Sequence, residues 1–231
     1  MPNKPKSAFW AAILKEYKLE DTVKSKEQST TPTTALQHAS PLQLSVQTTS
    51  INAGEAVFCD AAWNPDPSPQ QARAGIGIFI QMGNDNQHCK NLHVAALSPP
   101  ASSPLQAEAF GLLLATKLAE LLQLQEPQFY TDCLVLASAA ATEDITKAPG
   151  HWYIRPLLAE IQRSNSFQAS RTQHIHRSSN VKAHHQARLA LKIQSRSLLI
   201  RCLCSSSSLC PTKDISVFNV APFTLLSVKC A

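Results

Sequence analysis

The sequence predicts an α/β domain built on a five-stranded mixed sheet, in the order β-β-β-α-β-α-β-α. Three short apolar segments, at 56–63, 74–82 and 90–97, come first and are separated by turn-forming residues, which is typical of an antiparallel meander. From residue 104 the apolar residues take helical spacing, and helical segments then alternate with short strand-like ones. A strand that follows a helix favours a parallel neighbour, so we expect the sheet to be mixed.

The composition allows one domain of ordinary size with two tails. Of the 231 residues, 44% are hydrophobic, which is enough for a real core. We expect a domain over 53–196, a Ser/Thr/Gln-rich linker over 1–52 and a poorly ordered tail over 197–231. Because the chain has neither a long apolar run nor a convincing signal peptide, we expect an intracellular monomer, in the nucleus or the cytoplasm, with no membrane contact.

The first half of the domain should be mostly strand. A Pro-rich loop over 64–71 follows the first strand, and the turn after Met82 leads into the third. In the second strand, Gly75 and Gly77 would admit the close approach of a neighbouring backbone.

The second half should alternate helices with strands. Pro104 suits the first turn of a helix, and Pro127 ends that helix. A strand at 128–133, helices at 134–141 and from about Pro156, a strand at 167–176 and a helix at 180–194 complete the domain, with Asn180 available as a helix cap.

Three carboxylates lie within otherwise apolar segments: Asp60, Glu108 and Asp132. Burying a carboxylate is costly unless it has a partner, and a cation is a suitable one. Asp60 alternates inward on its strand, Glu108 lies one turn from Leu105 and Leu112, and Asp132 lies at a strand exit. Taken singly, each has an ordinary alternative; Glu108, for example, could pair with Lys117 or with an arginine elsewhere in the chain.

Residues 55 to 192 resemble the type 1 ribonuclease H domain, and more narrowly its plant reverse-transcriptase-like form in retroelements. The matching segments occur in the family's order and are VFCDAAW, AGIGIFI, LQAEAFGLLLA, FYTDCLVL, GHWYIRPLLAEI and HIHRSSNVKAHHQARLA. The resemblance implies a ribonuclease H-like fold that brings Asp60, Glu108 and Asp132 together to bind Mg²⁺, with Mn²⁺ as an alternative. It also implies a nucleic-acid partner, an RNA–DNA hybrid whose RNA strand is cut by two-metal-ion hydrolysis.

The same resemblance supplies further candidates around the helix at 180–194. His174 matches a histidine that aids proton transfer and product release, although His176 competes for that position. Arg177, Asn180 and Lys182 are expected to contact nucleic acid, with helix capping as an equal alternative for Asn180.

His184 is a departure from the family pattern, which has an Asp four residues after Asn180. Neutral imidazole brings no negative charge and suits zinc or manganese better than magnesium, so His184 is a weak metal ligand. The stretch from 161 to 213 contains no Asp or Glu that could substitute for it, but it has nine Lys or Arg residues. A stretch whose charged side chains are all positive suits either contact with phosphates or a solvated helical face.

The remaining observations are less specific. Cys202, Cys204 and Cys210, with Cys230 following, could bind zinc, but the usual CxxC pairing is missing, so the sequence does not predict a zinc site there. Trp63 and Trp152 could stack on bases, although a core position is the stronger expectation. Besides the enzyme, two alternatives stay open: a binding module that has lost cleavage, and a non-functional retroelement remnant.

Overall fold

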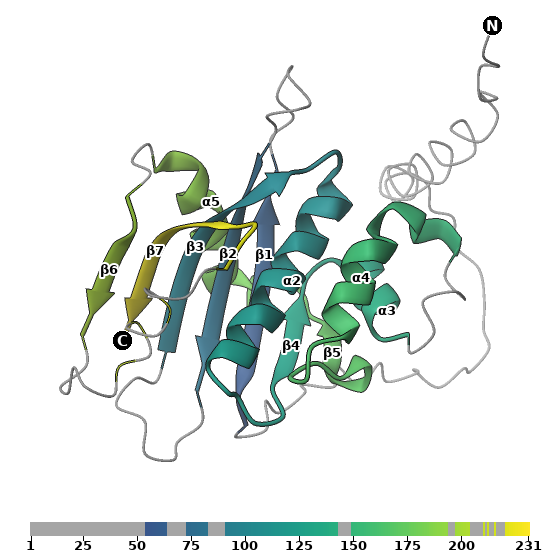
Figure 1. Cartoon of the computed structure of the whole chain (residues 1–231), viewed down its shortest axis with the longest axis horizontal. Helices are drawn as coiled ribbons and strands as arrows, with labels where there is room; N and C mark the ends of the chain where they lie inside the picture. Colours follow the sequence, from purple (N-terminus) through teal and green to yellow (C-terminus); the bar gives the residue numbers. More distant parts are fainter. Residues whose placement is uncertain are drawn as a thin grey trace, which may run out of the picture. The chain divides into compact units, whose positions relative to one another are not determined.

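The computed structural model describes residues 54–63, 73–82, 91–142, 149–193, 197–203, 210, 212, 215 and 220–231. Its strands form one sheet with the order β5-β4-β1-β2-β3-β7-β6 (Figure 1). The predicted linker over 1–52 and the predicted loop over 64–71 lie outside the described residues. In chain order, the elements are β1 (Ala56–Ala62), β2 (Arg73–Gln81), β3 (Asn91–Pro100), α2 (Pro104–Leu121), β4 (Gln128–Thr131), α3 (Leu134–Ala140), η2 (Pro149–Ile154), α4 (Arg155–Gln162), η3 (Ala169–Arg171), β5 (Thr172–His174), η4 (Arg177–Ser179), α5 (Val181–Lys192), β6 (Leu199–Cys202) and β7 (Thr224–Cys230).

The first three strands form the predicted antiparallel meander, and the sheet is mixed as predicted. β1 pairs with β2 and β2 with β3, both antiparallel. β4 is parallel to β1, in a register that sets Cys59 beside Thr131, and β5 is parallel to β4. Because β1 and β4 run the same way, the residues that follow Cys59 and Thr131 emerge side by side.

Helix α2 packs on one face of the sheet, together with α3 and α4 (Figure 1). It begins as predicted at Pro104, and the Oγ atom of Ser103 caps it by accepting a hydrogen bond from the backbone N–H of Gln106. Lys117 forms an ion pair with Glu160 of α4, at 2.7 Å. The suggested pairing of Lys117 with Glu108 is therefore wrong, and Glu108 is left for another role.

Helix α5 packs on the opposite face, directly over β2. A Cβ atom at Gly77 would overlap the backbone of Ala183 and Ala187, and one at Gly75 would overlap the Ala187 carbonyl oxygen. Only glycine allows a helix to lie this close to a strand. The prediction of close backbone approach at Gly75 and Gly77 is confirmed, and the approaching element is α5.

The prediction of five strands is wrong, because the sheet has seven. The two additional strands, β6 and β7, come from the region expected to be a poorly ordered tail. β7 pairs antiparallel with β3, and β6 pairs parallel with β7. β7 therefore pairs with the backbone N–H and C=O groups along the edge of β3. This pairing joins segments far apart in the chain, and no local sequence pattern predicts it.

Candidate metal centre

Asp60, Glu108 and Asp132 converge at one end of β1 and β4. Each offers a carboxylate oxygen, and the three oxygens all lie within 4.8 Å of one another. Asp60 is on β1, and Asp132 directly follows β4. Glu108 is in the early part of α2, which crosses β1 with Gly111 beside the Asp60 backbone. Three elements thus bring together the three carboxylates that the sequence singles out.

Burial and mutual repulsion make this cluster costly to ionise. Burial, reinforced by the charge of Asp132 and opposed by a hydrogen bond from His184, raises the pKa of Asp60 to about 6. Burial, reinforced by the charges of Asp60 and Asp132, raises the pKa of Glu108 well above its usual range. Two neighbours, the backbone of Ala61 and the charge of Arg177, act in the opposite direction on Glu108.

The donor set fits a divalent cation. Within the described part of the chain, the Oε2 atom of Glu108 is buried and accepts no hydrogen bond. A buried oxygen without a partner, beside two further carboxylates, needs positive charge to offset its lost hydration. Hard oxygen ligands of this kind suit Mg²⁺ or Mn²⁺ rather than softer metals.

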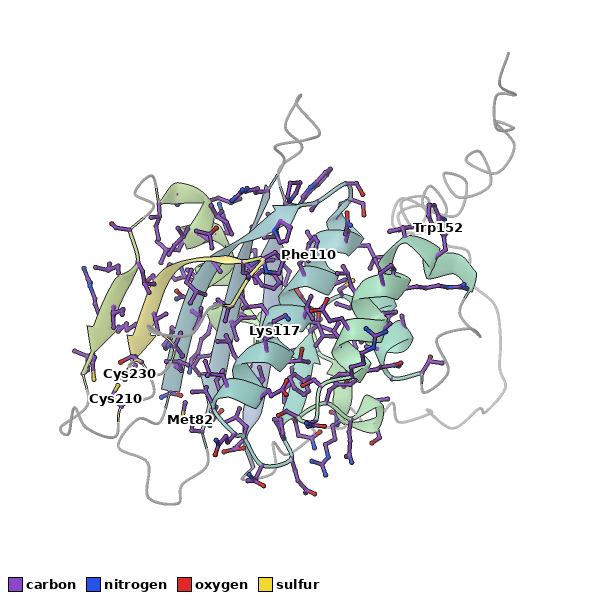
Figure 2. The ribbon with its side chains drawn as sticks, in the orientation of Figure 1. Met82, Phe110, Lys117, Trp152, Cys210 and Cys230 are labelled. Carbon is purple, nitrogen blue, oxygen red and sulfur yellow. The ribbon has the colours of Figure 1, made fainter. Side chains whose placement is uncertain are left out.

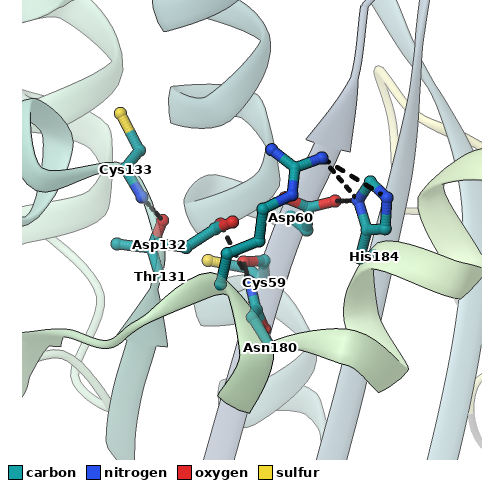
Figure 3. Close-up of polar contacts among 8 residues, drawn as sticks. Cys59, Asp60, Thr131, Asp132, Cys133, Asn180 and His184 are labelled. Atoms are coloured by element: carbon teal, nitrogen blue, oxygen red, sulfur yellow. Dashed lines mark hydrogen bonds and ion pairs between the residues drawn. The ribbon is translucent and has the colours of Figure 1, made fainter. Parts of the chain in front are cut away.

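Asn180 holds Asp132 in place. Its Nδ2 group donates to the Asp132 Oδ1 atom at 3.0 Å and to the Cys59 carbonyl oxygen at 2.9 Å (Figure 3). Asn180 stands at the N-cap position of α5, but its side chain makes no capping hydrogen bond, so the capping alternative is wrong. With 1% of its surface exposed, Asn180 is also enclosed, which does not agree with the expected nucleic-acid contact. It is a positioning residue that ties α5 to both β1 and the end of β4.

His184 lies on α5 one turn after Asn180 and contacts the cluster directly. Its Nδ1 atom is 2.8 Å from the Asp60 Oδ2 atom (Figure 3). When Asp60 is ionised, Nδ1 must carry the proton, because a carboxylate only accepts. The Nε2 atom of the neutral ring is then an acceptor for the Arg177 Nη2 group at 3.4 Å. A hydrogen-bond donor therefore stands where the family pattern has a fourth acid.

His174 and His176 differ in their surroundings. His174 ends β5 beside Thr131 in the register and is exposed. His176 is used locally, since its Nδ1 atom accepts a hydrogen bond from the Ser178 backbone N–H at 3.3 Å and contacts the Ser178 hydroxyl at 2.7 Å. The predicted strand over 167–176 is shorter than expected, with η3 (Ala169–Arg171) replacing its first part.

Two of the predicted nucleic-acid contacts are exposed cations, Arg177 in η4 and Lys182 in α5. Arg177 is exposed and reaches His184, as described above. Lys182 is exposed too, and its Nζ atom lies 4.2 Å from the centre of the Phe79 ring. Trp63 packs against the core, as expected. Trp152 is 67% exposed, so the prediction that it lies in the core is wrong.

Sequence reasoning missed the positioning role of Asn180, although one signal was available. Asn180 and His184 are four residues apart at the start of a helix, so their side chains share one face. A polar pair on the face that carries Ala183 and Ala187 toward the sheet indicates contact with a polar site.

One comparison with known proteins identifies the family of the chain. A family model described as reverse transcriptase-like matches residues 59–190, more than half of the chain. The chain therefore belongs to the reverse transcriptase-like family, and its domain is ribonuclease H-like. No curated protein matches it.

Solved ribonuclease H structures are similar to the chain at low identity. Ribonuclease H1 from the halophilic archaeon Halobacterium salinarum NRC-1 is 17% identical, with a TM-score of 0.44, over 60% of this chain and 97% of that one. The N-terminal ribonuclease H domain of a Mycobacterium tuberculosis protein is 17% identical, with a TM-score of 0.44, over 59% and 94%. LC11 ribonuclease H1, in complex with an RNA/DNA hybrid, is 17% identical, with a TM-score of 0.40, over 60% and 96%.

None of the helices in the described part of the chain has both the length and the apolar character that crossing a membrane requires.

Proposed function

We propose that this domain is an endonuclease that hydrolyses the RNA strand of RNA–DNA hybrids. The observation that carries the proposal is the meeting of Asp60, Glu108 and Asp132 within 4.8 Å, with one buried Glu108 oxygen that accepts no hydrogen bond from the described residues. These three residues would hold Mg²⁺, or Mn²⁺, with His184 as a weaker fourth ligand. Two such ions would supply a water activated near neutral pH and stabilise the charge that develops on the leaving oxygen.

The other residues of the chain would orient the cluster and bind the substrate. Asn180 holds Asp132 through the 3.0 Å hydrogen bond, so that both carboxylates at the ends of β1 and β4 face the same point. Arg177, which is exposed and contacts His184, and Lys182, which is exposed on α5 over Phe79, can pair with phosphate oxygens. His174, exposed at the end of β5, can take up or release a proton at its ring during product release.

The substrate class follows from the kind of surface beside the cluster. Arg177, an exposed cation whose charge acts on Glu108, can bind phosphate without reading base sequence. A hybrid recognised by the shape of its minor groove and by its 2′-hydroxyls fits such a surface. We further propose that the domain acts as a monomer in the nucleus or the cytoplasm; its plant-type origin stays a prediction from the sequence.

A cleavage assay tests the proposal. An RNA–DNA hybrid labelled on the RNA strand is incubated with the protein in Mg²⁺ and, separately, in Mn²⁺, with Asp132→Asn as the blank. We expect internal cuts in the RNA strand that the blank does not make. Tight binding of the hybrid with no cleavage in either metal would overturn the proposal.

A specific contact favours a second candidate, a binding module without cleavage. The His184 ring occupies the Asp60 Oδ2 atom, which a metal ion would otherwise use. If that hydrogen bond outcompetes the metal, the protein binds hybrids equally well in Mg²⁺ and in a chelator. The endonuclease instead requires that Mg²⁺ or Mn²⁺ be bound at the carboxylates, so titrating either metal into the metal-free protein separates the two.

A further inference from the structure

Three cysteines from the C-terminal region meet at one end of β6 and β7. The Sγ atoms of Cys202 and Cys210 are 3.1 Å apart, those of Cys210 and Cys230 are 3.2 Å apart, and those of Cys230 and Cys202 are 3.3 Å apart. Figure 2 shows Cys210 and Cys230 close together at this end of the molecule. Each sulfur therefore has two other sulfurs as near neighbours.

The backbone around this cluster is held by the sheet. Cys202 and Cys230 are register partners in the parallel pair of β6 and β7. Cys230 is also a register partner of Leu92 in β3, and Asn91 exchanges two backbone hydrogen bonds with Ala231, each of 2.9 Å. Two of the three sulfurs are thus carried by strands whose positions are set by main-chain pairing, which is the rigid support that a metal site needs.

The three cysteines are mostly enclosed, but the site is open to solvent at Cys202. Cys230 is fully buried and Cys210 is 3% exposed, whereas Cys202 is exposed. Small hydrophobic cysteines of a core would be surrounded by hydrocarbon, but here sulfur faces sulfur, and the Cys210 Sγ atom also lies 2.9 Å from the Thr212 hydroxyl. Ordinary core packing does not account for this arrangement.

We propose that Cys202, Cys210 and Cys230 form a zinc site with three thiolate ligands that fastens β6 and residue 210 to β7. Thiolates are soft ligands that select zinc over Mg²⁺, so this site and the carboxylate cluster take different metals. Three thiolates leave one position of a tetrahedral ion for a further ligand, which solvent can supply beside the exposed Cys202. Cys204 lies outside the described residues and is not counted among the ligands.

The geometry needs only a small adjustment. A Zn–S distance of about 2.3 Å in a tetrahedral site places sulfur atoms about 3.8 Å apart. The observed separations are 3.1–3.3 Å, so each pair of sulfurs must move apart by roughly half an ångström to admit the ion. Rotation of the exposed Cys202 side chain can widen its own two separations, whereas the pair of Cys210 and Cys230 requires a small shift of one of those buried residues. This proposal does not depend on the proposed nuclease activity.

The test uses the full chain, purified under reducing conditions and stripped of metal. Co²⁺ is titrated in first, because thiolate ligands give it an intense charge-transfer absorption that carboxylates and imidazole do not. Zn²⁺ is then added to displace it. We expect one equivalent of Co²⁺ with thiolate charge transfer, full displacement by one equivalent of Zn²⁺, and a rise of several degrees in melting temperature on Zn²⁺ binding.

The variants separate the site from general effects on folding. Cys202→Ser changes an exposed residue, so it should fold normally and bind Zn²⁺ at least tenfold more weakly, with reduced charge-transfer absorption. Cys133→Ser is the matched control, since Cys133 is only partly buried and is remote in the fold from β6 and β7; it should bind Zn²⁺ like the natural chain. Either of two results overturns the proposal: no thiolate charge transfer with Co²⁺, or equal Zn²⁺ affinity in the Cys202→Ser variant and the natural chain.

Discussion

Replacing Asp60 by asparagine should stabilise the metal-free protein at pH 8. In the folded chain the pKa of Asp60 is raised from 3.8 to about 6, chiefly by burial. A raised pKa of an acid means that the folded state loses stability as the pH rises from about 4 to 6, because over that range the unfolded chain releases the Asp60 proton while the folded chain still holds it. The difference of about 2 units, at about 1.36 kcal/mol each, sets an upper limit of about 3 kcal/mol.

The expected gain for Asp60→Asn is about 1–3 kcal/mol at pH 8, because the titration of Asp60 is shared with its neighbours. Asparagine keeps an acceptor for His184 and removes the charge. For a domain of this size the gain corresponds to roughly 3–10 °C in melting temperature. At pH 4 the gain should nearly vanish, because the native Asp60 is then protonated in the folded chain.

Thermal unfolding at pH 4, 6 and 8 measures this, once in a chelator and once in Mg²⁺. Mg²⁺ should stabilise the natural chain at pH 8 and have little effect on Asp60→Asn, since the variant has lost a ligand. Glu126→Gln is the control, because that side chain is 79% exposed and should change stability by less than about 0.5 kcal/mol at any of the three pH values. An equal gain for Asp60→Asn at pH 4 and pH 8 would refute the reasoning from buried charge.

Three further predictions concern residues of α5 and the strand beneath it. His184→Asp should raise the apparent Mg²⁺ affinity about tenfold, because it adds a fourth hard anionic ligand. It should also lower the melting temperature of the metal-free protein, because the added charge repels the other carboxylates. Unchanged Mg²⁺ binding by calorimetry would show that position 184 is not a ligand position. Asn180→Ala should cost about 1–3 kcal/mol in urea unfolding, since it removes two enclosed hydrogen bonds; a cost near zero would show that these bonds contribute nothing. Gly77→Ala should lower the free energy of unfolding by more than about 2 kcal/mol, because its Cβ would overlap Ala183. Gly54→Ala, with open space around it, should lower it by less than about 0.5 kcal/mol. Equal unfolding midpoints for the two variants would contradict the close packing of α5.

The hydrogen bond between His184 and Asp60 shows what a histidine does at the position where the family pattern has an Asp. A fourth carboxylate would raise the cost of the metal-free cluster further, whereas His184 donates to Asp60 and lowers its pKa relative to burial alone. His184 therefore makes the metal-free cluster less repulsive than a fourth carboxylate would.

The carboxylate cluster was predictable from the sequence because each member is marked locally. Asp60, Glu108 and Asp132 each interrupt an apolar segment of recognisable period, and the order of those segments resembles one family. The meander and the helix at Pro104 were predictable for the same reason, since alternation and helical spacing are short-range patterns. The close approach at Gly75 and Gly77 followed from the absence of side chains at two positions of one strand.

Only the tertiary structure decided which residues act on that cluster and where the sheet ends. The position of Asn180 between Cys59 and Asp132, and the contact of His184 with Asp60, depend on how α5 lies across β1. The sixth and seventh strands, and the meeting of Cys202, Cys210 and Cys230, depend on pairings with β3 and β7 between segments far apart in the chain. Local patterns determine what each segment becomes, because they set which face is apolar. Contacts between distant segments are determined by how those faces pack, and the sequence carries no local mark of them.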